Sequence, residues 1–323
     1  MTGSRDGRTG PALVAAAIVV LAFVPLFGNE YTVHVLTIGF YYTILAASWN
    51  LLAGFTGQFS LAQQTFATIG AYTSGLLVYH FGTPIPLSMA SGVVLAAALG
   101  WALGRMVLRM RAIYLAIATW AFAETVHVLL TAGFNWTRGE LGLNVPPLYG
   151  HLDPRPYFYT FLGLAALCLA GMYAFVRSPY GTFMRAIRDD ELRAESLGVD
   201  TIRVKVLVFT ITSAIAGLAG AFYAHYVAVL SPQMADFNEM AKLVVMVVVG
   251  GLGSFAGPIV AAAPLQWLTT WLQKWGEWDM VVYALVVIVL MRAYPGGLTA
   301  LFRTLVRAGG RGTPGGAGRQ IRS

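Results

Sequence analysis

Long apolar stretches dominate the chain, and short polar segments separate them. No Asp, Glu, Lys or Arg occurs from Tyr31 to Gly104 or from Leu243 to Gln273. Because a helix needs roughly 20 apolar residues to cross the hydrocarbon core of a membrane, runs of this length must fold back and cross more than once. Backbone groups in lipid need partners within the chain, which favours helices, and the alternating pattern of a membrane β-barrel is not seen. We predict an all-α, polytopic membrane protein with about 8–10 transmembrane helices.

The apolar runs define ten candidate spans. The first follows Arg5 and Arg8 as a signal peptide would, but no small-residue cleavage pattern comes after it, so we interpret it as a retained helix. The last three candidates are short, and one of them fits a re-entrant segment. The candidate spans are residues 11–28, 34–53, 61–80, 85–105, 112–132, 156–177, 204–230, 241–256, 258–273 and 280–294.

Basic residues gather in four zones: the N-terminus, residues 105–111, residues 177–205 and the C-terminal tail. An excess of Lys and Arg marks cytoplasmic loops, and with ten spans all four zones fall on one side. Both termini are then cytoplasmic. The net charge of +7 is explained by this bias and by contact with anionic lipid, without nucleic acid. We predict one transmembrane domain over residues 1–310 and a disordered, Gly-rich cytoplasmic tail over residues 311–323.

The segment Arg177–Lys205 is the main exception to the apolar pattern. It holds six of the 21 Lys and Arg residues and five of the 14 Asp and Glu residues. Ser178 is a suitable helix N-cap before Pro179, which is favoured at the first helical position. Asp190 is a suitable cap for a second helix, and Gly198 is a typical helix stop. The segment is therefore predicted to form one or two short helices.

Apolar residues recur in this segment at roughly helical spacing, with charged residues around them. Such a helix fits a partner protein's groove, or it lies on the membrane surface as an amphipathic helix. Anionic lipid would repel the five acidic residues, which favours docking on a protein. The apolar positions are Phe183, Met184, Ile187, Leu192 and Leu197.

Two glycine-rich breaks interrupt the apolar runs, at Gly54–Phe59 and Gly250–Pro258, and both fit the pattern G-x-x-G-x-F. Interrupted spans at matching places in two halves point to a transport pathway and to possible pseudo-symmetric halves. The alternative is close helix packing through small residues, since Gly217–Phe222 fits the same pattern inside an ordinary span. The glycines of the two breaks are Gly54, Gly57, Gly250, Gly251, Gly253 and Gly257.

Few polar residues lie within the spans. Glu124 and His127 share one face of a predicted helix, and Glu124 either lines a pathway or makes a buried structural hydrogen bond. His225 is interpreted as a packing residue. A polar cluster around the first glycine break suits a pathway for a polar solute. Its members are Asn50, Gln58, Ser60, Gln63, Gln64 and Thr65.

Three ordered blocks carry a resemblance to a known family. They are RSPYG and RAIRDDELRAESLGV between residues 177 and 199, GFTGQFSLAQQTFATIGAYTSGLL at residues 54–77, and VVVGGLGSFAGPIVAAA at residues 247–263. With these blocks the chain resembles branched-chain amino acid ABC-transporter permeases of the LivM type, over residues 35–300. One departure is Ala62-Gln63, where relatives often have Gly-His.

The resemblance implies a membrane subunit of an importer in the bacterial inner membrane. Its expected partners are a second related permease, two ABC ATPase subunits and an extracytoplasmic solute-binding protein. The implied substrates are branched-chain amino acids or a related small polar solute such as urea. The charged segment resembles the element that couples such permeases to the ATPase. By residue match the coupling positions are Arg185, Arg188, Asp189, Asp190, Glu191, Glu195 and Gly198.

The sequence contains no G-x-x-x-x-G-K-[ST] motif, so ATP and Mg²⁺ are expected on partner subunits. We expect no enzymatic activity and no bound cofactor or metal in this chain. The alternative function is a stand-alone secondary transporter or channel for a small polar solute. It would act without ATPases and would have more ionisable residues within its spans than Glu124 alone.

Overall fold

The computed structural model describes residues 21–25, 28–110, 112–151 and 153–272, and the single residues 282, 285, 288 and 292. The predicted spans 11–28 and 280–294 lie largely outside the described residues. The N-terminal basic zone and the predicted tail 311–323 lie wholly outside them. The described part is a bundle of helices with one two-residue strand pair, which confirms the all-α prediction.

Eight long or medium helices make up the bundle within the described residues, and each corresponds to one predicted span. The first of them ends in a π-helical turn, η1 (Leu51–Phe55). The helices are α2 (Glu30–Asn50), α3 (Gln63–Phe81), α4 (Ile85–Val107), α5 (Ala112–Ala132), α7 (Pro154–Arg177), α10 (Thr201–Val227), α11 (Phe237–Gly250) and α12 (Ala256–Leu272).

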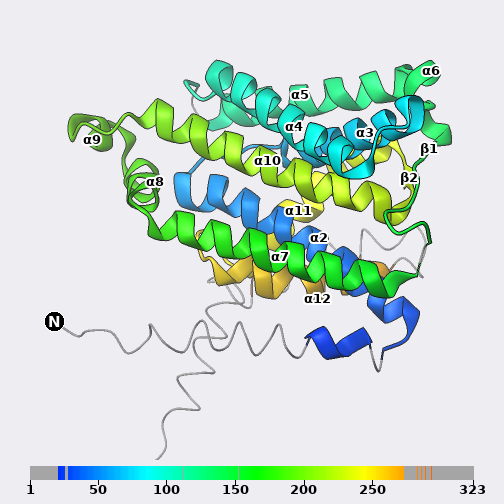
Figure 1. Ribbon diagram of the computed structural model, residues 1–323. Helices are drawn as coiled ribbons and strands as arrows, with labels where there is room; N and C mark the ends of the chain where they lie inside the picture. Colours follow the sequence, from blue (N-terminus) through cyan, green and yellow to red (C-terminus); the bar gives the residue numbers. More distant parts are fainter. Residues whose placement is uncertain are drawn as a thin grey trace, which may run out of the picture.

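Short elements connect the bundle helices at its two ends. At one end the charged segment forms two helices between α7 and α10. At the other end, short helical turns and a strand pair join α5 to α7 and α10 to α11 (Figure 1). These elements are α8 (Pro179–Asp189), α9 (Glu191–Ser196), α6 (Phe134–Thr137), η2 (Gly139–Leu141), β1 (Leu143–Asn144), β2 (Val229–Leu230) and η3 (Pro232–Ala235).

Five described segments are long and apolar enough to cross a membrane: α2 with η1, α4, α5, α7 and α10. The other three predicted spans in the described residues also form helices, and α3 and α12 lie within two residues of their predicted bounds. The prediction of a span over 241–256 is wrong at both ends, because α11 starts at Phe237 and stops at Gly250, where Gly251 takes a φ of 114°. At 1.5 Å per residue, the 14 residues of α11 extend about 21 Å, which is less than the hydrocarbon core.

Helix α2 forms the centre of the bundle. Within the span Glu30–Phe55, 89% of an apolar 18-residue stretch is buried inside the protein. It packs against α7, α10, α11 and α12. Helices α3, α4 and α10 form a second group with close backbone contacts. A Cβ at Gly220 of α10 would lie 1.9 Å from the carbonyl oxygen of Ala67 on α3, and one at Gly70 would lie 2.1 Å from that of Gly217. The third G-x-x-G-x-F match is thus a packing contact between helices, as its alternative interpretation held.

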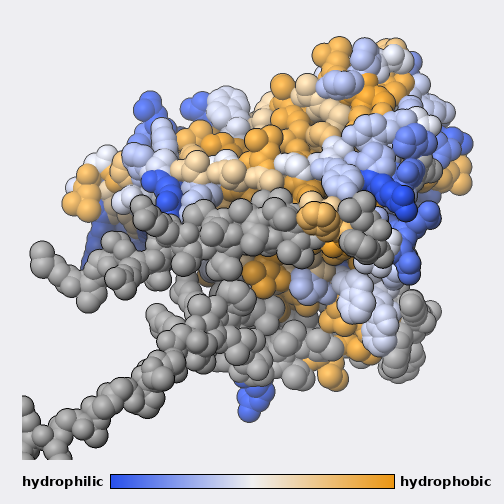
Figure 2. All heavy atoms as spheres, turned by 60° about the horizontal axis from the view of Figure 1, so that its bottom comes forward, coloured by the Kyte–Doolittle hydropathy of each residue, from blue (hydrophilic) through white to orange (hydrophobic). Residues whose placement is uncertain are grey.

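The connections fall at two ends of the molecule. The α4–α5 connection with Arg109 lies at the same end as α8 and α9, and the β1–β2 pair lies at the opposite end (Figure 1). Hydrophilic residues gather toward the ends of the described surface, and hydrophobic residues occupy the region between them (Figure 2). Two of the predicted basic zones are therefore on one side of the bundle.

Candidate functional site

The charged segment forms two short helices, as predicted. Pro179 is the first residue of α8, and the side chain of Asp190 caps α9 by accepting a hydrogen bond from the amide of Arg193 at 3.1 Å. Gly198 has a φ of 85° just after α9. Ser178 occupies the N-cap position of α8, but the predicted capping hydrogen bond is absent. Its hydroxyl donates instead to the carbonyl of Phe175 at 2.6 Å.

The apolar stripe of this segment divides into two sets. Met184 and Ile187 are buried against the bundle, with 0% and 4% exposure. Leu192 of α9 and Leu197 directly after α9 are 75% and 84% exposed, and Phe183 of α8 is 37% exposed. The first set attaches the segment to the bundle, and the second set is left free at its tip.

Two of the predicted coupling residues fasten α9 to the start of α10. The carboxylate of Glu195 accepts a hydrogen bond from the Thr201 hydroxyl at 2.7 Å. Glu191 pairs with Lys205, whose side chain is only 8% exposed. These contacts join α9 to the first turns of α10, and α8 packs against both helices, so the three form one continuous unit.

Arg188 connects this unit to both glycine breaks. Its guanidinium donates a hydrogen bond to the carbonyl of Gly54 at 2.9 Å. A Cβ at Gly253 would lie 2.9 Å from the same guanidinium, and one at Gly57 would lie 3.2 Å from Cγ of Arg188. Arg185 and Asp189 are exposed on the same helix.

The two breaks also contact each other, although about 200 residues separate them. Asn50 bridges them, because its Oδ1 accepts from the amide of Gly253 and its Nδ2 donates to the carbonyl of Ser254, both at 2.9 Å. A Cβ at Gly54 would lie 2.5 Å from the amide nitrogen of Gly253. Glycine is therefore required for this approach. Asn50, which was predicted to line the pathway, is 1% exposed and connects the two breaks through its side-chain amide.

The polar residues around the first break differ in how their side chains are used. The Ser60 hydroxyl accepts from the amide of Ala62 at 3.3 Å, and its backbone carbonyl accepts from the Trp49 indole at 2.7 Å. Gln63 donates to Ser48 and to the carbonyl of Thr212. Thr65 is buried, with 1% exposure. Ser60 and Gln63 thus have structural partners.

Gln58 and Gln64 have unused hydrogen-bonding capacity. Both amide atoms of Gln58 are buried without a partner, and so is Oε1 of Gln64. These side chains are 4% and 3% exposed. Buried polar groups in proteins normally find a partner, so each of these atoms points to a water molecule or a solute.

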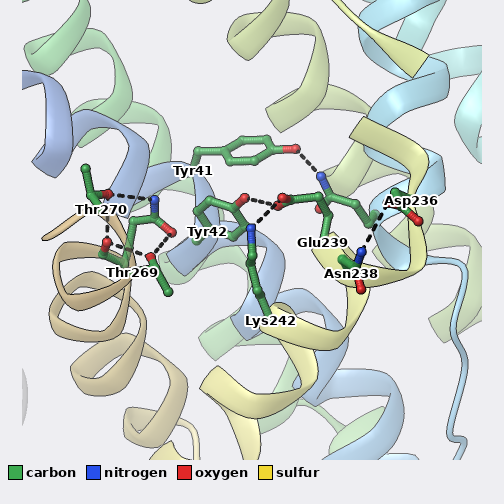
Figure 3. A network of polar contacts seen from close by, with 10 residues as sticks. Tyr41, Tyr42, Asp236, Asn238, Glu239, Lys242, Thr269 and Thr270 are labelled. Atoms are coloured by element: carbon green, nitrogen blue, oxygen red, sulfur yellow. Dashed lines mark hydrogen bonds and ion pairs between the residues drawn. The ribbon is translucent and has the colours of Figure 1, made fainter. Parts of the chain in front are cut away.

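A polar cluster that sequence reasoning missed lies in the middle of the bundle. The Tyr42 hydroxyl donates to the carboxylate of Glu239 at 2.5 Å, and Lys242 pairs with the same carboxylate at 2.6 Å (Figure 3). Tyr42 is near the centre of the 26-residue span Glu30–Phe55, so this ion pair is at mid-depth. In the sequence, Glu239 and Lys242 lie in FNEMAK, directly before the uncharged run that begins at Leu243. Because the predicted span was placed on that apolar run, both charges were expected at or beyond its end and not inside the bundle.

Two helices begin inside the bundle, next to this cluster. Helix α3 starts at Gln63, and its Gln64 donates to the hydroxyl of Tyr41 at 3.1 Å. Helix α11 starts at Phe237, and Glu239 lies in its first turn. Neither helix has a side-chain hydrogen bond at its N-cap. The segments before them, residues 56–62 and 228–236, carry the chain into the bundle from opposite ends.

Glu124 is exposed on α5 and makes no hydrogen bond or ion pair with another described residue. The interpretation as a buried structural hydrogen bond is therefore wrong for Glu124. His127 bonds to the carbonyl of Pro232 at 3.0 Å. His225 is 0% exposed and bonds through both ring nitrogens, to Ser74 and to the carbonyl of Pro146, as expected of a packing histidine. Within the described ranges, no group of three or more His, Cys, Asp or Glu residues is placed to hold a metal ion.

Comparisons with known proteins place these features in a family. The family described as "Branched-chain amino acid transport system / permease component" matches residues 31–291. The high-affinity branched-chain amino acid transport system permease protein LivM of Escherichia coli is 32% identical over 92% of this chain and 77% of the relative. The corresponding protein LivH is 25% identical over 79% of this chain and 90% of the relative. No solved structure matches the chain.

Proposed function

Because the chain belongs to the family of permease components of branched-chain amino acid transport systems, we propose that it is a membrane subunit of an importer driven by separate ATPase subunits. In this proposal ATP and Mg²⁺ bind to the partners. The relatives LivM and LivH are both named as permeases of branched-chain amino acid transport. We extend this to a pair of related permeases here, with a solute-binding protein on the far side of a bacterial inner membrane.

The connection made by Arg188 carries this proposal. Its side chain links α8 to Gly54 and Gly253, so a displacement of the charged segment acts directly on both glycine breaks. The Glu191–Lys205 and Glu195–Thr201 contacts extend the same unit into α10. Movement of an ATPase against this unit is thereby transmitted to helices that flank the proposed path.

The exposed tip of α9 is the surface that we assign to the ATPase. Leu192 and Leu197 are largely exposed there, and Arg193 beside them is 86% exposed. These leucines lie at one end of the molecule (Figure 1), outside the hydrophobic middle region of the bundle that faces lipid. Exposed apolar side chains at such a place are typical of a surface that binds another protein. The end that carries α9 is then cytoplasmic, as are both termini.

The family's relatives support branched-chain amino acids as the solutes of this importer. The test is uptake of labelled leucine into proteoliposomes that contain this permease, its paired permease, the ATPases and the binding protein. Uptake that requires ATP and the binding protein supports the proposal. Failure of the ATPases to co-purify with the permease pair would contradict it.

One observation favours the alternative of a stand-alone transporter. Glu239 and Lys242 add ionisable residues at mid-depth, as that alternative expects. The same proteoliposomes without ATPases distinguish the two functions, since a stand-alone transporter accumulates leucine under an ion gradient alone. We expect no accumulation in that sample.

A further inference from the structure

The mid-bundle cluster has hydrogen-bonding capacity that its own residues do not use. Oε1 of Gln64 is a buried acceptor with no donor. The Tyr41 hydroxyl accepts a hydrogen bond from Gln64, and among the described residues its own proton has no acceptor. The unused acceptor on Gln64 and the unused donor on Tyr41 are therefore neighbours, because the amide group of Gln64 is itself hydrogen-bonded to the Tyr41 hydroxyl.

Charges of both signs lie beside these groups. The ring centroids of Tyr41 and Tyr42 lie 5.2 Å apart, the Tyr42 hydroxyl donates to the Glu239 carboxylate, and Lys242 pairs with the same carboxylate. The side chains of Glu239 and Lys242 are 25% and 28% exposed, so neither is sealed off. The pair presents a carboxylate and an ammonium at the same depth.

Two helix N-termini add partial positive charge at this place. The first turns of α3 and α11 contain Gln64 and Glu239, and neither helix is capped by a side chain. Free backbone amides at the start of a membrane-embedded helix favour an anionic group on a solute. The direction of this field suits a carboxylate more than a neutral solute.

We propose that Tyr41, Gln64, Glu239 and Lys242 form a binding position for the head group of a solute that carries both an ammonium and a carboxylate. The ammonium meets Glu239 and Oε1 of Gln64, and the carboxylate meets Lys242 and the Tyr41 hydroxyl. The proposal rests on the proposed function, since it names where an imported amino acid pauses within this subunit. It predicts a contribution of the permease itself to selection, in addition to the binding protein.

The test measures binding of labelled L-leucine to the purified importer complex in nanodiscs, without the solute-binding protein. Gln64→Leu removes the unused acceptor at similar volume. The double variant Glu239→Gln/Lys242→Met removes both charges together and leaves neither charge unpaired. Gln266→Leu on α12 is the matched control, because the amide of Gln266 bonds to Thr269 and Thr270 of its own helix.

We expect Gln64→Leu and the double variant to weaken leucine binding about tenfold to a hundredfold, as the loss of charge-assisted hydrogen bonds does. Gln266→Leu should stay within about twofold of wild type. Leucine amide and the keto acid of leucine each lack one charge and should compete poorly. Equal binding by all variants, or equal competition by the two analogues, would overturn the proposal and leave water as the occupant.

The same preparations separate this inference from the proposed function. ATP-dependent uptake of leucine by the wild-type complex with its binding protein tests the importer. If uptake is intact and the permease pair shows no leucine binding, the binding position is refuted and the importer stands. If the wild-type complex takes up no leucine with all partners present, the importer itself is refuted.

Discussion

At the scale of single residues, Arg188 joins the charged segment to the two glycine breaks. Arg188→Ala removes the hydrogen bond to the Gly54 carbonyl and leaves the surface of α9 unchanged. We expect ATPase binding to be retained and ATP-driven uptake to fall about tenfold or more, since a hydrogen bond from a charged group is lost at the connection. Co-purification and proteoliposome uptake measure the two effects separately.

The control for this prediction is Arg155→Ala on α7, because Arg155 is exposed, lies outside the predicted coupling positions, and its side chain makes no hydrogen bond or ion pair with the described residues. This variant should transport like wild type. If Arg188→Ala and Arg155→Ala behave alike, Arg188 does not transmit the movement.

Gly220 tests close packing between α3 and α10. In Gly220→Ala the new Cβ would lie 1.9 Å from the Ala67 carbonyl oxygen, so the helices must separate. We expect a loss of about 1–3 kcal/mol in the free energy of unfolding, as for other overpacked contacts. Gly163→Ala on α7 meets nothing within 4 Å and serves as the control. Thermal unfolding of the purified protein in detergent measures both, and equal midpoints would contradict the packing.

At the scale of elements, one side of the short helix α9 contacts α10 through Glu191 and Glu195, and the other side, with Leu192 and the adjacent Leu197, is exposed. We assign the first side to attachment and the exposed side to ATPase binding. The double variant Leu192→Asp/Leu197→Asp places charge on the exposed side and leaves the Glu191 and Glu195 contacts intact. We expect the ATPase to dissociate from the purified complex, since loss of apolar anchors at an interface costs about 1–3 kcal/mol each. Pull-down of the ATPase by a tag on this chain measures it.

Leu141→Asp is the matched control for the α9 variant. Leu141 is 70% exposed in η2, at the opposite end of the molecule. It should leave ATPase binding unchanged. Retention of the ATPase by the α9 variant, with a folded permease, would show that docking takes place elsewhere.

The sequence predicted the bounds of a helix correctly where the apolar run in the sequence has the same length as the helix in the structure. Helices α4, α5 and α7 begin and end within two residues of their predicted bounds. It misplaced both ends of α11, because a helix that begins at mid-depth brings its first charges, Glu239 and Lys242, into the bundle. Depth follows from tertiary packing against α2 and has no signature in local hydropathy.

The site shows the same division. Glycine spacing located both breaks, and the charged segment's caps located α8 and α9. The contact of the breaks through Asn50, and the reach of Arg188 to Gly54, join residues more than 130 positions apart. Long-range contacts of this kind depend on the relative placement of helices, so a single sequence carries no pattern for them.

At the scale of the whole molecule, the two ends of the bundle have different chemistry. The α4–α5 connection and the α8–α9 unit share one end, with Arg109 and most of the charged segment. The β1–β2 pair and η2 occupy the other. If the basic end is cytoplasmic, α9 faces the compartment that contains ATP, and the segments before α3 and α11 enter the bundle from the cytoplasmic and outer sides respectively.

Cysteine labelling in intact cells tests this orientation. Cys168 is the chain's single cysteine and is buried, so Cys168→Ala gives a silent background. In that background Thr182→Cys on α8 and His151→Cys beyond β1 each add one exposed thiol, at opposite ends. A membrane-impermeant maleimide should label the His151→Cys protein directly and the Thr182→Cys protein only after permeabilisation. The reverse pattern would put α9 outside the cell and exclude any ATPase partner there, so this experiment decides whether the coupling proposal is geometrically possible.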